Sequence, residues 1–226
     1  MSSASDGILK VYMANIDIRD LMEFEPQELT SSSFIKSTRQ DMFSHQVSFD
    51  KPIGEPYLYR ELINLLYMAD ENTEFNFFFN TPGGNLSAAM AIIEAMKSSE
   101  SLVRAIITGE CHSAGSMIAL NCQEVIVTES AHALIHTGSY GTGGDAHKIQ
   151  SHVDFSTKMI NKILDTTYSG FLNLDELNDV KRGIEFWFDS EEIKVRLDNR
   201  KLYLEAKRKI EESKTDDSKV KSKTKA

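Results

Sequence analysis

The sequence contains only two cysteines, Cys111 and Cys122, among 226 residues. Both stand inside apolar runs, as reduced and buried thiols of cytoplasmic proteins do, which argues against a disulfide-stapled scaffold. Their spacing matches neither a C-x-x-C pair nor a Cys/His zinc site. We therefore expect no metal and no other cofactor.

Long apolar runs are also missing. No stretch reaches the roughly 18 apolar residues that a membrane-spanning helix needs. The N-terminal stretch MSSASDGILKVYMANIDIRD contains no basic segment followed by an apolar one, which a secretory signal requires. The sequence therefore predicts a cytoplasmic protein without a membrane partner.

Positive charge is scarce relative to negative charge. The formal net charge is −9, with 25 Lys and Arg against 34 Asp and Glu. A nucleic-acid-binding face needs clustered Lys and Arg, so nucleic acid is excluded as the main ligand. The hydrophobic content of 41% is sufficient for a real core. The length suits one ordinary domain with appendages, or two small ones.

Strand and helix patterns alternate regularly from about residue 46. Strands that alternate with helices pair in parallel, which predicts an α/β fold. The strands are nearly all apolar, so both faces of the sheet are expected to be covered. The expected strands are 46–54, 74–80, 102–110, 124–129 and 132–136, and the expected helices are 56–70, 86–99, 113–122 and 145–172.

The two ends of the chain lack this regularity. Residues 1–45 are expected to form an N-terminal extension, in which ILKVYM is a candidate strand. Residues 46–195 form the expected functional domain. Residues 196–226 are expected to form a helix and a Lys- and Ser-rich tail, disordered over the last dozen residues or so.

The stretch GECHSAGSMIAL places Ser113 where a strand turns into a small-residue helix. Unpaired N–H groups at a helix start favour negative charge, so a serine there could attack a carbonyl beside oxyanion donors. A plain helix cap is the competing interpretation, because N-caps prefer serine. Cys111 stands where a G-x-S-x-G nucleophile elbow has its first glycine.

Two further features surround this serine in the sequence. His136 closes the run HALIH before a Gly-rich segment, and histidine can act as a general base or simply be structural. The turn NTPGGN contributes Gly83 and Gly84. Their backbone can direct N–H groups at a ligand, or only connect a strand to a helix.

Taken in order, these motifs make the chain resemble the proteolytic subunits of Clp proteases, the ClpP family. FFFNTPGGNLSAAMAIIEAM is similar to the family's strand, Ser-Pro-Gly-Gly turn and helix. ITGECHSAGSMIAL is similar to its Gly-x-Ala-Ser-Met-Gly segment, and ALIHTG to its Met-Ile-His-Gln-Pro segment. The resemblance covers about residues 47–195. It implies the ClpP/crotonase-like spiral of ββα units with a projecting handle helix, from about 146 to 170.

The resemblance also implies a serine endopeptidase, with Ser113 as nucleophile and His136 as general base. The backbone N–H groups of Gly84 and Ala114 would form the oxyanion hole, and Gly83 and Gly138 would line the substrate edge. The expected partners are further copies of the chain in heptameric rings, an AAA+ unfoldase that feeds the ring chamber, and unfolded protein substrates.

A third triad residue is expected in LNLDELNDVKRGIEFWFDSEEI. A small shift against the family's pattern places Asp179 at the catalytic aspartate, and without it Val180 or Lys181 falls there. A carboxylate is needed to hold the imidazole tautomer. We predict Asp179, with Glu176 and Glu185 as alternatives.

Other functions stay open at this point. A catalytically weak or inactive ring subunit would need no carboxylate behind His136. A virus prohead maturation protease would share the fold and the chemistry. An acyl-CoA-handling crotonase would share the spiral but leave Ser113 and His136 without a paired role.

Overall fold

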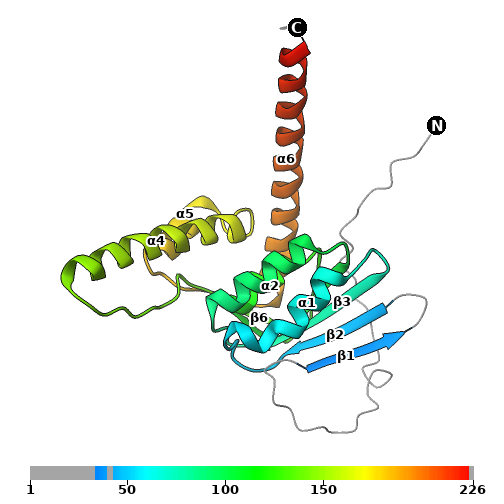
Figure 1. The fold of residues 1–226 in the computed structure, drawn as a ribbon, viewed down its shortest axis with the longest axis horizontal. Helices are drawn as coiled ribbons and strands as arrows, with labels where there is room; N and C mark the ends of the chain where they lie inside the picture. Colours follow the sequence, from blue (N-terminus) through cyan, green and yellow to red (C-terminus); the bar gives the residue numbers. More distant parts are fainter. Residues whose placement is uncertain (1–33, 40–42, 224–226) are drawn as a thin grey trace. The chain divides into compact units, whose positions relative to one another are not determined.

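The computed structural model describes residues 34–39 and 43–223 (Figure 1). Contacts divide the chain into two compact units: the residues up to Ile135 with Phe186–Ser190, and His136–Glu185 with the residues from Glu191 onward. The expected segments 1–45, 46–195 and 196–226 follow composition and resemblance, and they stay a prediction. The strand expected at ILKVYM lies outside the described residues.

The first unit is built on a seven-stranded sheet. The strand order is β1-β2-β3-β4-β6-β7, and β5 pairs with the first half of β4 while β6 pairs with its last residues. Neighbours from β2 to β6 pair in parallel, whereas β1 and β7 pair antiparallel at the two ends. The strands are β1 (Phe34–Arg39), β2 (Phe43–Phe49), β3 (Thr73–Thr81), β4 (Leu102–His112), β5 (Glu124–Val127), β6 (His132–Ile135) and β7 (Phe186–Phe188).

Helices connect the parallel strands, as the alternating pattern predicts. α1 packs against α2 and α2 against α3. Figure 1 shows α1 and α2 lying over the sheet. These connections are η2 (Pro56–Tyr59), α1 (Arg60–Met68), α2 (Leu86–Ser98) and α3 (Ala114–Ala119). The α/β fold class is thereby confirmed.

The core lies on one face of the sheet, because side chains alternate along each strand. Phe75, Phe77 and Phe79 on β3 are fully buried, and the ring of Phe49 on β2 stacks on Phe79 with centroids 5.0 Å apart. The residues between them, such as Phe78, are only half-buried. The expectation that both faces are covered therefore does not hold for the single chain.

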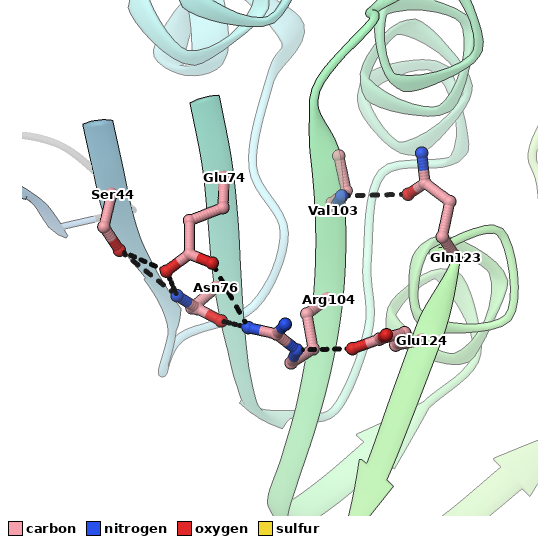
Figure 2. A network of polar contacts seen from close by, with 7 residues as sticks. All are labelled: Ser44, Glu74, Asn76, Val103, Arg104, Gln123 and Glu124. Atoms are coloured by element: carbon pink, nitrogen blue, oxygen red, sulfur yellow. Dashed lines mark hydrogen bonds and ion pairs between the residues drawn. The ribbon is translucent and has the colours of Figure 1, made fainter. Parts of the chain in front are cut away.

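The half-buried face carries a chain of polar contacts across four strands (Figure 2). Arg104 on β4 lies at its centre: its Nε donates to Glu124 on β5 at 2.7 Å, and its Nη1 donates to Asn76 on β3 at 2.8 Å. Ser44 on β2 donates to Glu74, whose carboxylate is 3.6 Å from Arg104. Each charge in this chain of contacts has a partner and remains partly exposed, so its burial is not costly.

The second unit contains three helices: α4 (Ala146–Tyr168), α5 (Leu174–Lys181) and α6 (Ser190–Lys223), the last of which begins at the end of the first unit. Asp145 caps the start of α4, because its side chain accepts a hydrogen bond from the N–H of Lys148. This helix covers nearly the whole range expected for the handle.

Two arginines one turn apart join α6 to the connection between α4 and α5. Arg200 donates to the carbonyl of Thr167 in the last turn of α4. Arg196 donates to the carbonyl of Phe171 at 3.1 Å, and its two terminal nitrogens bind the two carboxylate oxygens of Glu176 at 2.7 and 2.9 Å. Bidentate pairs of this kind are among the stronger polar contacts in proteins.

The structure differs from the sequence-based expectation at three places. β1 lies inside the expected N-terminal extension, and β7 was not expected as a strand. α6 continues to Lys223, through most of the tail that was expected to be disordered. Lys and Glu favour helices, and no Gly or Pro follows Gly183 to end one.

Truncation of the aromatic core should destabilise the first unit. We expect Phe79→Ala to lower the free energy of unfolding by about 3–5 kcal/mol, because it leaves a cavity among fully buried rings. Phe78→Ala, on the same strand but on the half-buried face, is the matched control and should cost less. Urea unfolding followed by circular dichroism measures both, and equal losses would contradict this division of the two faces.

Acid should weaken the link between α5 and α6. The hydrogen bonds from Arg196 hold the pKa of Glu176 below its ordinary range, against the opposing effect of partial burial. A carboxylate whose folded pKa is lowered contributes stability above its unfolded pKa and loses it as pH falls through the folded value. Glu176→Gln should therefore be less stable than wild type at neutral pH.

The difference between Glu176→Gln and wild type should shrink as the pH falls below the usual glutamate pKa of about 4.3. Urea unfolding of both proteins, at neutral pH and at a pH below this pKa, measures the effect. Glu191→Gln, an exposed glutamate in the first turn of α6, is the control. A Glu176→Gln difference that stays constant with pH would contradict the role of the pair.

Candidate active site

Ser113 lies in the sharp turn between β4 and α3. Its backbone angles are φ 51° and ψ −120°, and it is the only non-glycine residue with positive φ in the described part of the chain. Its side chain makes no capping hydrogen bond to α3. A helix cap normally has an extended backbone and a side chain that accepts from the first turn. The cap interpretation of Ser113 is therefore not supported.

The turn is held by hydrogen bonds of the Ser113 backbone. Its N–H donates to the carbonyl of Leu134 on β6 at 2.8 Å. Its carbonyl accepts from the N–H of Met117 at 3.1 Å and from the hydroxyl of Ser116 at 2.8 Å. Positive φ is costly for a side chain other than glycine, so surrounding contacts such as these must hold it in place.

The parallel pairing of β4 and β6 places Ser113 next to the end of β6. His112 stands opposite Leu134 in this ladder, which ends both strands at the same edge of the sheet. The chain continues from Leu134 through Ile135 to His136. The sequence-predicted nucleophile and base thus follow two neighbouring strands.

Gly83 lies directly against the serine turn. A Cβ atom on Gly83 would lie 2.5 Å from the carbonyl oxygen of His112, 2.8 Å from the Cβ of Ser113 and 3.0 Å from the amide nitrogen of Ala114. Its φ of +89° also lies in the region that favours glycine. Only glycine allows this close approach, so the Gly-Gly turn and the serine turn form one packed structure.

Gly84 forms a bridge to Ile53. The carbonyl of Gly83 accepts from the Ile53 N–H, and the N–H of Asn85 donates to the Ile53 carbonyl, both at 2.8 Å. A Cβ on Gly84 would lie 2.3 Å from the Ile53 oxygen, which again requires glycine. The bridge uses the carbonyl of residue 83 and the N–H of residue 85, so the N–H of Gly84 takes no part in it.

His136 has a carboxylate near its ring. The Nδ1 atom of His136 is 3.9 Å from Oε1 of Glu185, and the two side chains are 26% and 52% exposed. The carboxylate of Asp179, in α5, instead pairs with Arg182 at 3.2 Å. Glu176 is bound by Arg196. Of the three carboxylates predicted as third triad residue, Glu185 is the one with a recorded ion pair to His136 among the described residues.

Lys181, which with Val180 was one of the two residues expected at the family's aspartate position without a shift, forms an ion pair with Asp165 on α4. Gly138 follows His136 in a segment without regular structure, with φ +82° and open space around it. Its expected place at the substrate edge stays a prediction, as does that of Gly83.

The two cysteines offer no second nucleophile. Burial raises the pKa of both thiols, and Cys111 raises that of Cys122 further, so both are protonated near neutral pH. The thiolate is the reactive form of cysteine. In the described residues, no group of three His, Cys, Asp or Glu side chains is placed to hold a metal ion.

The matches to known proteins agree with this geometry. A family model described as Clp protease matches residues 34–192, from the first residue of β1 to the first turn of α6. The chain belongs to the Clp protease family. The sheet, its connecting helices and the long α4 are consistent with the Clp protease fold that the sequence resemblance implied.

Several relatives in the Clp protease family carry the name ATP-dependent Clp protease proteolytic subunit. The protein from Streptococcus uberis is 29% identical over 140 residues, which cover 58% of this chain and 70% of the relative. The protein from Streptococcus gordonii is 26% identical over 151 residues, 62% of this chain and 75% of the relative. The protein from Streptococcus salivarius is 34% identical over 87 residues, 37% of this chain and 44% of the relative.

Most of α6 lies beyond the range that the Clp protease model matches. In the described ranges, no helix is long and apolar enough to cross a membrane. The sequence analysis also missed β7 and with it the position of Glu185. The aromatic triplet Phe186–Phe188, bounded by Gly183 and Asp189, was the available signal for a strand.

The contact between the two turns can be tested by adding one methyl group. Gly83→Ala and Gly183→Ala both place a side chain at positive φ, at a cost of about 1–2 kcal/mol. Only at position 83 does the new Cβ also collide with backbone, because nothing lies within 4 Å of a Cβ at position 183. We expect Gly83→Ala to be clearly less stable than Gly183→Ala in urea unfolding, and equal stabilities would contradict the packing described.

Proposed function

We propose that this chain is a serine endopeptidase, with Ser113 as nucleophile and His136 as general base. The backbone at Ser113 is the observation that carries the proposal: φ is 51°, and the turn packs against Gly83. A serine that only caps a helix needs no strained backbone. A strained strand-to-helix turn is typical of a serine whose hydroxyl is presented to a substrate.

Two backbone N–H groups are suited to bind the oxyanion. Ala114 provides the first N–H after the nucleophile, and Gly84 provides one that its bridge with Ile53 does not use. A Cβ on Gly83 would lie 3.0 Å from the amide nitrogen of Ala114, which supports the closeness of the two segments. Removing one such donor in other serine proteases costs on the order of 10²–10³ in turnover.

The chemistry follows from these roles. As the Ser113 oxygen bonds to the scissile carbonyl carbon, His136 accepts its proton and then gives that proton to the leaving amine when the C–N bond breaks. A water molecule attacks the resulting ester in the same way, with His136 taking its proton and returning one to Ser113. Gly83 and Gly138 are proposed to border the bound peptide.

We further propose that copies of the chain form rings, with seven subunits as the family resemblance implies, and degrade proteins unfolded by an ATP-dependent partner. The relatives' name, ATP-dependent Clp protease proteolytic subunit, supports this. So does α4, which exposes Phe155 and Met159 and would bury them against another copy.

A catalytically weak ring subunit is the second candidate. The pairs Asp179–Arg182 and Glu176–Arg196 favour it, because they engage two of the three predicted carboxylates in ion pairs away from His136. In this case the chain would keep the fold and the assembly but turn over substrate slowly.

A fluorophosphonate probe separates the two candidates, because it reacts with an activated serine and not with ordinary hydroxyls. We expect labelling of the wild type at Ser113, loss of labelling in Ser113→Ala, and normal labelling in Ser87→Ala, an exposed serine on α2. Mass spectrometry of the labelled peptide identifies the site. A folded, unlabelled wild type would overturn the endopeptidase proposal and favour the weak subunit.

A further inference from the structure

We infer that Glu185 positions His136 for catalysis, in place of the aspartate predicted at 179. This inference rests on the proposed peptidase function, since it concerns the base of that site. Its basis is the register of β7, the three-residue strand that pairs antiparallel with β6.

The ladder of β6 and β7 ends one residue before His136 and Glu185. In it, Leu134 pairs with Trp187 and Ile135 pairs with Phe186. Each step forward on β6 is a step back on β7, so the same register continued by one residue would pair His136 with Glu185. Side chains of directly opposed residues in antiparallel pairs lie on the same face, with Cβ atoms about 4.5–5.5 Å apart. The direction of the two strands thus leads His136 and Glu185 toward each other, in agreement with the 3.9 Å between their side chains.

The other candidate carboxylates are engaged elsewhere. Asp179 pairs with Arg182, and the carbonyl of Asp179 accepts from the N–H of Ile184 where α5 ends. Glu176 is held by Arg196 in a bidentate pair. Glu185 has no recorded cationic partner besides His136 within the described ranges. Moving Asp179 or Glu176 toward His136 would break an existing ion pair, whereas Glu185 needs no such exchange.

Glu185 faces Nδ1 of His136, the ring nitrogen that a triad carboxylate contacts. A carboxylate beside Nδ1 of His136 accepts the proton of that nitrogen, which leaves Nε2 as the base toward the serine. The same charge stabilises the imidazolium that forms in each step. The distance of 3.9 Å exceeds that of a charge-assisted hydrogen bond, about 2.7–2.9 Å, so the pair must close by roughly 1 Å when the ring becomes charged.

The exposure of Glu185 limits how much this contact contributes. The side chain is 52% exposed, so water and salt screen its charge more than that of a buried triad aspartate. For Glu185→Gln we expect kcat to fall on the order of 10- to 100-fold with little change in KM, less than the roughly 10⁴-fold loss known for a buried triad aspartate. Glu185→Asp keeps the charge but withdraws it by one methylene, and should give an intermediate kcat.

The kinetic test compares four variants on a short fluorogenic peptide. Glu185→Gln should lose more activity than Glu185→Asp. Asp175→Asn, which removes an exposed carboxylate on α5, should behave as wild type. Asp179→Asn is the competing variant. A large loss of kcat in Asp179→Asn with an unchanged Glu185→Gln would overturn the inference and restore Asp179 to the role.

A second measurement does not depend on turnover. Nitrogen NMR of histidine-labelled protein reports which ring nitrogen of His136 carries the proton, with His136→Gln to assign the signal. We expect the Nδ1–H form in the wild type and a mixture of tautomers in Glu185→Gln. An unchanged tautomer in Glu185→Gln would overturn the inference, even in a protein that no fluorophosphonate labels. A protein with the expected tautomer shift but no labelling would refute the peptidase proposal alone.

Discussion

The four residues of β6 are the constraint on which the candidate site depends. β6 pairs in parallel with the end of β4 on one side and antiparallel with β7 on the other. Next to the first pairing, the N–H of Ser113 donates to the carbonyl of Leu134. The second pairing ends one residue before His136 and Glu185, whose side chains lie 3.9 Å apart. A slip of one residue in either ladder would move every side chain to the other face of the sheet. The register of one short strand therefore sets both the serine turn and the surroundings of the histidine.

The strain at Ser113 and the absence of a side chain at Gly83 are two parts of the same feature. A serine at φ 51° persists only when its surroundings hold it, and here they include β6, the first turn of α3 and the backbone of the Gly-Gly turn. Close backbone approach replaces side-chain packing at this point. It also brings together the segments that contain the N–H groups of Gly84 and Ala114.

Electrostatics separates the structural carboxylates from the one proposed to act. Glu176 and Asp165 connect helices of the second unit through Arg196 and Lys181, and Asp179 pairs with Arg182 near the end of α5. A carboxylate that is paired with its own cation is stabilised in that position. A match of such a carboxylate to the family's sequence pattern therefore does not by itself indicate a catalytic role. This is why a position counted along the chain from the family's pattern and a position set by strand pairing give different residues for the third member of the triad.

The sequence by itself determined the α/β class, the order of the Gly-Gly turn, the serine turn and the histidine, and a long helix close to α4. These features depend on residue chemistry and on periodicity over ten or more neighbouring positions, which are local properties. Only the tertiary structure decided that β1 and β7 extend the sheet, that one sheet face stays polar, and that Glu185 rather than Asp179 lies beside His136. A three-residue strand has no measurable period, and its register is set by a partner some fifty residues away in the chain. No local pattern contains that information, because the pairing is fixed by backbone hydrogen bonds that form only when the sheet assembles.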